Sequence, residues 1–113
     1  MKPAPYNLVI YQRATFRQRI RLLVNSGQPA LALGYSVAAQ FWDDKRRTLF
    51  AAFDVEIVDL ATSTIELVIP FEVTRQLRKG GKWDLLVTTP YGDRQYWVEG
   101  NVTVDPGYTD IEA

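Results

Sequence analysis

The sequence predicts an all-β fold, because short segments of alternating apolar and polar residues recur along it and turn residues separate them. Alternation places every second side chain of a strand on the same face. Glycine and proline mark the turns, since glycine accepts a positive φ and proline cannot continue a ladder of hydrogen bonds. A length of 113 residues suits one domain. We therefore expect a single domain over residues 1–113, with its core in 6–105 and a short acidic tail, 106–113, that is loose unless a partner holds it.

Seven or eight extended segments follow from this pattern, since two of them adjoin each other. In chain order they are Asn7–Tyr11, Thr15–Val24, Tyr35–Trp42, Thr48–Phe53, Asp54–Val58, Thr64–Ile69, Trp83–Thr88 and Gln95–Val104. Residues 25–29 are rich in polar residues, glycine and proline, so we expect a turn there. The last two segments form a hairpin around 89–93, in which Tyr96 and Val98 face inward and Trp97 faces outward.

One segment, Phe71–Arg78, has the distribution of a short helix. We expect it to be a crossover between two sheets. The number and near-regular spacing of the strands then predict an immunoglobulin-like antiparallel β-sandwich of seven to eight strands with one short helical crossover. A small closed barrel is the main alternative, because the Cys and Trp landmarks of antibody domains are missing.

The composition excludes several functional classes. Without cysteine there are no disulfides or thiolate metal sites, and without histidine the commonest general base and metal ligand are absent. Ser26, Ser36 and Ser63 therefore have no histidine to activate them. Residues 79–82 lack the spacing of a phosphate-binding loop and are expected to form a turn. We expect a protein that is not an enzyme and needs no cofactor and no metal.

No targeting signal is visible in the sequence. No apolar run approaches the roughly 20 residues that a membrane span requires. The first five residues lead into a strand pattern rather than into the apolar segment of a secretory signal. We therefore expect no membrane partner and synthesis in a cytoplasm.

Charge is balanced overall but not along the chain. Up to Arg47 there are eight basic and two acidic side chains, and the remainder carries the matching acidic surplus. The two halves attract each other, or each faces a different partner. Three of the basic residues share the outer face of one predicted strand. We call them the arginine row: Arg17, Arg19 and Arg21.

The arginine row has two interpretations. In an immunoglobulin-like layout its strand pairs with 64–69, which sets the row beside Glu66 for cross-strand ion pairs. Alternatively, the row docks on an acidic partner surface or a phosphate backbone. Nucleic acid is not expected, because the net charge is zero and no aromatic lies between the arginines to stack on a base.

A second cluster is aromatic. If 35–42 lies beside the final hairpin, Trp42, Leu86 and Trp97 point away from the core and form an apolar patch. Such patches on soluble proteins usually mark contact surfaces, so we expect a subunit or partner interface here. A platform for stacking on sugars is one alternative, and a shifted register that buries these residues is the other.

Several short segments carry a family resemblance. They are Asn7-Leu8-Val9-Ile10-Tyr11, Thr15-Phe16-Arg17, Gly27-Gln28-Pro29, Leu33-Gly34-Tyr35-Ser36-Val37-Ala38-Ala39-Gln40, Ile65-Glu66-Leu67 and Gly100-Asn101-Val102-Thr103-Val104. In this order they resemble small bacteriophage virion proteins with an immunoglobulin-like module of the tail and baseplate type, similar to the N-terminal module of baseplate upper proteins. The resemblance covers about residues 7–104.

The resemblance implies a structural protein of the virion, made in the host bacterial cytoplasm. We expect an adaptor or accessory subunit of the tail, baseplate or tail fibre, present in several copies or as a homo-oligomer and bound to other virion proteins. Related modules usually continue into a helical or receptor-binding region, so an end at Ala113 favours a stand-alone subunit. The alternatives are a carbohydrate-binding module that stacks Trp42, Trp97 or Tyr91 on a host surface glycan, and a capsid decoration protein.

Overall fold

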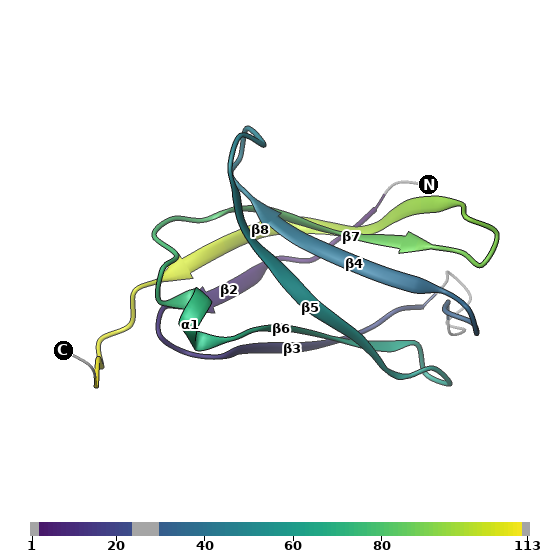
Figure 1. Cartoon of the computed structure of the whole chain (residues 1–113), viewed down its shortest axis with the longest axis horizontal. Helices are drawn as coiled ribbons and strands as arrows, with labels where there is room; N and C mark the ends of the chain where they lie inside the picture. Colours follow the sequence, from purple (N-terminus) through teal and green to yellow (C-terminus); the bar gives the residue numbers. More distant parts are fainter. Residues whose placement is uncertain (1–2, 24–29, 112–113) are drawn as a thin grey trace.

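The computed structural model describes residues 3–23 and 30–111, and within these it confirms the all-β prediction (Figure 1). The elements are β1 Ala4–Pro5, β2 Leu8–Tyr11, β3 Phe16–Arg21, β4 Ser36–Trp42, β5 Leu49–Asp59, β6 Thr64–Ile69, α1 Phe71–Thr74, β7 Gly81–Thr88 and β8 Arg94–Asp105. The predicted turn at 25–29 and the predicted strand end at Val24 lie outside the described residues.

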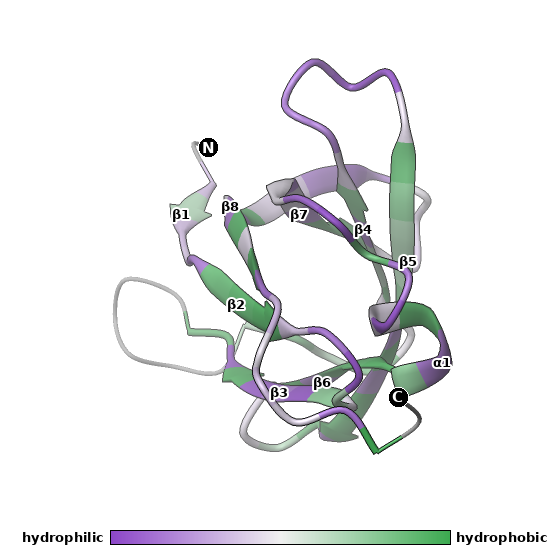
Figure 2. Ribbon diagram, turned by 90° about the vertical axis from the view of Figure 1, so that its left-hand side faces the viewer, coloured by the Kyte–Doolittle hydropathy of each residue, from purple (hydrophilic) through white to green (hydrophobic). Residues whose placement is uncertain are grey.

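The strands form one curled, mixed sheet. Its order is β1-β8-β7-β4-β5-β6-β3, with β2 also beside β8. The prediction of a wholly antiparallel arrangement is wrong at the N-terminus, because β1 and β2 run parallel to β8. A parallel pair needs a long connection, and here most of the chain lies between the two strands. Seen end-on, the sheet curls around an interior, and its free edges β2 and β3 lie on the same side (Figure 2).

Strand β5 joins the two parts of this sheet. Residues 49–53 of β5 pair with β4, and residues 54–59 pair with β6 (Figure 1). The first part of the sheet thus contains β1, β2, β8, β7, β4 and the start of β5, and the second part contains the end of β5, β6 and β3. Two separate strands over 48–58 were predicted. The structure has a single strand because no turn residue interrupts the alternation there.

The core lies between these two parts. Six large apolar side chains in it are almost fully buried: Ile10, Phe41, Ile65, Leu67, Ile69 and Leu85. The Phe53 ring lies 5.9 Å from the Phe16 ring and 5.8 Å from the Trp83 ring, so aromatic contacts link the two parts. Each fully buried large apolar side chain contributes about 1.5–3 kcal/mol, which makes this interior the main source of stability.

Three β-bulges change the side-chain alternation, and the one between β5 and β6 leaves Val58 as the extra residue between the pairs Ile57–Ile65 and Asp59–Thr64. Between β4 and β5 the pairing passes from Phe41–Ala51 to Trp42–Leu49, which leaves Phe50 as the extra residue. Between β7 and β8 it passes from Leu85–Val98 to Leu86–Tyr96, which leaves Trp97 as the extra residue. Phe50 and Trp97 both pack against the core.

The helical crossover exists but is shorter than predicted. Helix α1 begins after Pro70 and ends at Thr74, whereas the sequence predicted a helix to Arg78. The chain leaves the helix early enough for Leu77 to enter the core. The buried Thr74 hydroxyl donates to the carbonyl of Ala14 at 2.8 Å, which ties α1 to the loop before β3. This segment connects β6, in the second part of the sheet, to β7, in the first part.

A close backbone contact holds the N-terminal strand against β8. A Cβ atom on Gly100 would lie 2.0 Å from the carbonyl oxygen of Tyr6, so only glycine fits there. The same oxygen accepts a hydrogen bond of 2.8 Å from the indole of Trp83. The amide of Tyr6 in turn donates to the carbonyl of Glu99 at 2.8 Å. These contacts bridge the gap between β1 and β2.

Residues 106–111 of the C-terminal tail make contacts with Arg13, where the sequence predicted a loose tail. The Arg13 guanidinium donates to the carbonyls of Pro106 at 2.6 Å and Thr109 at 3.3 Å. Arg13 also forms a 3.9 Å ion pair with Asp110. The side chain of Ile111 nevertheless stays almost fully exposed.

Candidate binding surfaces

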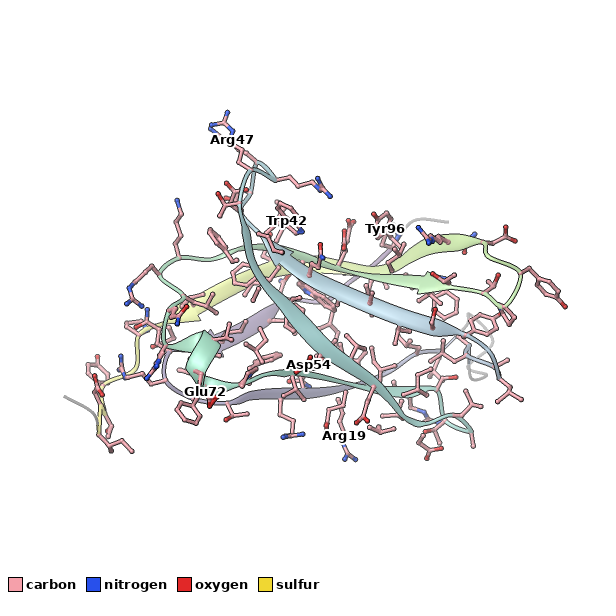
Figure 3. All side chains as sticks on the ribbon, in the orientation of Figure 1. Arg19, Trp42, Arg47, Asp54, Glu72 and Tyr96 are labelled. Atoms are coloured by element: carbon pink, nitrogen blue, oxygen red, sulfur yellow. The ribbon has the colours of Figure 1, made fainter. Side chains whose placement is uncertain are left out.

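The outer face of the first part of the sheet is a regular grid of side chains. Register places four rows across β4, β7 and β8. They are Ser36–Thr88–Arg94, Ala38–Leu86–Tyr96, Gln40–Asp84–Glu99 and Trp42–Lys82–Asn101. Directly opposed residues on neighbouring strands have Cβ atoms about 4.5–5.5 Å apart, so neighbouring side chains within a row can contact each other. Figure 3 shows Trp42 and Tyr96 on this side of the molecule and Arg19 on the opposite side.

The structure does not bring the predicted aromatic patch together. Trp97 is half-buried, packs against the core and lies 6.2 Å from the Tyr35 ring, so its predicted outward position is wrong. The bulge in β8 is the reason, because it brings Tyr96 opposite Leu86 in place of Trp97. Trp42 and Leu86 do share the outer face, but the row of Asp84 separates them.

A shallow groove of about 430 Å³ crosses the first part of the sheet at Trp42. We call it the sheet-face groove. Among the residues that line it are six from the outer face of β4, β7 and β8: Trp42, Asp84, Glu99, Gln40, Asn101 and Lys82. The Trp42 indole donates to the Gln40 side chain at 2.8 Å, and the Lys82 amine donates to the Asn101 side chain at 3.2 Å. These bonds fix four of the six side chains.

Two of the four carboxylates that line the groove repel each other. Asp84 and Glu99 lie directly opposite on β7 and β8. Partial burial raises the pKa of Asp84 above its ordinary value of 3.8, Glu99 raises it further, and Arg46 only partly opposes the effect. Within residues 3–23 and 30–111, neither carboxylate has a hydrogen bond or ion pair. The groove is therefore the electrostatically strained region of this face.

The hairpin between β4 and β5 forms one wall of the groove. Asp43 accepts backbone hydrogen bonds from Arg47 at 2.5 Å and Thr48 at 3.2 Å. The bond from Arg47 is the main reason that the pKa of Asp43 lies below its ordinary value. The Arg46 guanidinium lies 4.5 Å from the centre of the Trp42 ring. Asp43 therefore stabilises the turn.

The arginine row lies on the outer face of the second part of the sheet, and the predicted pairing with Glu66 is present for two of its members. Arg17 donates to one Glu66 oxygen at 2.7 Å, and Arg19 donates to the other at 3.0 Å. The hydrogen bond from Arg19 is the strongest influence on the pKa of Glu66. Together with Arg17 it lowers that pKa against the opposing effect of burial. Arg21 lies opposite Thr64 instead.

Sequence reasoning missed an acidic column on the same face. Across β6, register aligns Arg17 with Asp54, Arg19 with Glu56 and Arg21 with Asp59. We call these three residues the acidic column: Asp54, Glu56 and Asp59. All three are exposed. The alternation of Asp54 and Glu56 along β5 was a usable signal, but it pointed to this face only once β5 was known to reach β6.

In the described ranges, no helix is long and apolar enough to cross a membrane. The described residues also contain no group of three or more acidic, cysteine or histidine side chains able to hold a metal ion. Comparison with protein-family models and with curated protein sequences finds no match to this chain.

Proposed function

We propose that this chain is a non-enzymatic structural module of a bacteriophage particle, an adaptor or accessory subunit of the tail, baseplate or tail fibre. The module holds a rigid curled sheet and presents its two outer faces to neighbouring virion proteins. The observation that carries the proposal is the placement of polar and aromatic clusters. They lie on the outer faces of the sheet, as docking surfaces do, rather than in an enclosed cleft.

Strand topology supports an immunoglobulin-like classification of the module. In that fold the second and fifth strands pair in one sheet, and the third, sixth and seventh strands pair in the other. The match to this chain is made by counting β2 as the first strand. Here β3 pairs with β6, and β4 pairs with β7, which pairs with β8. The β5 strand would then supply an edge strand to each sheet in turn. The phage assignment itself rests on the sequence resemblance over about residues 7–104.

Mass spectrometry of purified particles of the encoding phage tests this function. We expect the chain in washed particles at a fixed stoichiometry to a tail or baseplate protein. A fixed stoichiometry to the major capsid protein, with loss from isolated tails, would instead identify a capsid decoration protein. Absence from particles that carry all other structural proteins would refute the proposal.

The sheet-face groove supports a second candidate, a carbohydrate-binding module for host recognition. Trp42 supplies an aromatic ring, and Gln40, Asn101 and Asp84 supply side chains that hydrogen-bond to hydroxyl groups. A glycan array probed with the isolated chain separates the two candidates. Binding that disappears in Trp42→Ala but persists in Tyr91→Ala would favour the glycan, because Tyr91 lies in the turn between β7 and β8. An adaptor binds no glycan in this assay.

A further inference from the structure

The outer face of the second part of the sheet has a charge pattern that is complementary to itself. The arginine row lies on β3, and the acidic column lies on β5. Between them runs β6, whose Glu66 binds two arginines and is only 8% exposed. A positive column and a negative column therefore flank an almost neutral central strand.

Charges on this face are only partly satisfied within the chain. Arg17 and Arg19 share a single carboxylate, which leaves one positive charge in excess, and both side chains remain more than half exposed. In the part of the chain that the structure describes, Arg21 has no ion pair. The same is true of all three members of the acidic column. Each guanidinium carries five N–H donors, so even Arg17 and Arg19 keep donors for a partner.

Consider a two-fold axis that runs parallel to β6 and lies just above this face. It would place the arginine row of one copy over the acidic column of the other. Rotation about such an axis exchanges the two sides of the face but preserves position along the strand. A second copy would therefore place Arg17 over Asp54, Arg19 over Glu56 and Arg21 over Asp59, each pair twice. An isologous interface of this kind needs a patch that is complementary to itself. The two buried Glu66 side chains would meet near the axis, each covered by its own arginines.

From this register we propose that the outer face of β3, β6 and the end of β5 is a homodimer interface, with a second copy of this chain as its partner. The inference does not depend on the phage assignment. Three strands about 4.8 Å apart and six residues of about 3.3 Å each give a face of about 300 Å². Stable interfaces bury about 800 Å² per partner, so the dimer is weak and depends on salt.

The test uses the row formed by Arg21 and Asp59, because neither side chain bonds to another part of the described fold. Arg21→Glu and Asp59→Arg each place like charges opposite each other twice in a homodimer. In a mixed dimer of the two variants, the introduced glutamate of one chain faces the introduced arginine of the other, and the unchanged Asp59 faces the unchanged Arg21. The matched control is Asp93→Arg, which makes the same charge change as Asp59→Arg in the turn between β7 and β8.

Sedimentation of the full chain at 20 mM and 500 mM NaCl measures the dimer, and native mass spectrometry identifies mixed dimers. We expect wild type and Asp93→Arg to dimerise at low salt. Arg21→Glu and Asp59→Arg should each weaken dimerisation at least about tenfold, and their equimolar mixture should recover it as a mixed dimer. A wild type that stays monomeric at low salt, a dimer that neither variant weakens, or a mixture that recovers nothing would overturn the proposal.

Discussion

Replacing Trp97 with alanine tests the β-bulge in β8, which decides the composition of the outer face. Trp97 is half-buried against the core, and its ring lies 6.2 Å from Tyr35. A large aromatic buries about 150–250 Å², so partial burial of about 100 Å² contributes about 2.5 kcal/mol. The contact with Tyr35 adds about 0.5–1.5 kcal/mol. We expect Trp97→Ala to lower the free energy of unfolding by about 3 kcal/mol.

The neighbouring residue is the matched control. Tyr96 is 51% exposed on the outer face, so Tyr96→Ala should cost less than about 1 kcal/mol. Uninterrupted alternation places Tyr96 inside and Trp97 outside, and it therefore predicts the reverse order. Urea unfolding followed by circular dichroism measures both variants, with the midpoint compared at constant slope. A larger loss for Tyr96→Ala than for Trp97→Ala would refute the bulge and the surface built on it.

Three further predictions concern the backbone and the two buried or crowded carboxylates. Gly100→Ala should destabilise the fold by about 1–3 kcal/mol in urea unfolding, because its Cβ would lie 2.0 Å from the Tyr6 oxygen; an unchanged midpoint would contradict that contact. Glu66→Gln should destabilise most at neutral pH. The lowered pKa of Glu66 means that its contribution is present above its ordinary value of 4.5 and is lost as pH falls through the lower folded value. A penalty that does not change with pH would exclude the ionised pairing. Asp84→Asn should stabilise the protein at pH 7, since the raised pKa of Asp84 reflects an unfavourable charge beside Glu99. The gain should vanish once pH falls below its ordinary value of 3.8, and destabilisation at pH 7 would disprove the repulsion.

Sequence alternation was enough to predict the strands that bury one face. Ile65, Leu67 and Ile69 all face inward as predicted, and the pairing of β3 with β6 sets Arg19 opposite Glu66. Strands β3 and β6 pair with each other in regular register, so a period of two holds along both. In both strands the alternation of apolar and polar residues matches the side chains that are buried in the core.

Alternation failed where register shifts or where pairing is distant in the sequence. A bulge adds one residue to a strand without changing the local composition, so no signal marked Trp97 as a core residue. The parallel pairing of β2 with β8 joins opposite ends of the chain and leaves no mark in either segment. The acidic column lies on the same face as the arginine row because the single strand β5 reaches from β4 to β6.

Hydroxyl-radical footprinting of the chain in purified phage particles tests the docking account most directly. Trp42, Tyr96 and Tyr91 are reactive side chains, and Tyr91 is 92% exposed in a turn away from the sheet faces. If neighbouring proteins cover this face, Trp42 and Tyr96 lose reactivity in the particle relative to the isolated chain, while Tyr91 keeps it. Equal reactivity of Trp42 and Tyr96 in the particle and in solution would contradict the account, because the outer face of the sheet would then be uncovered.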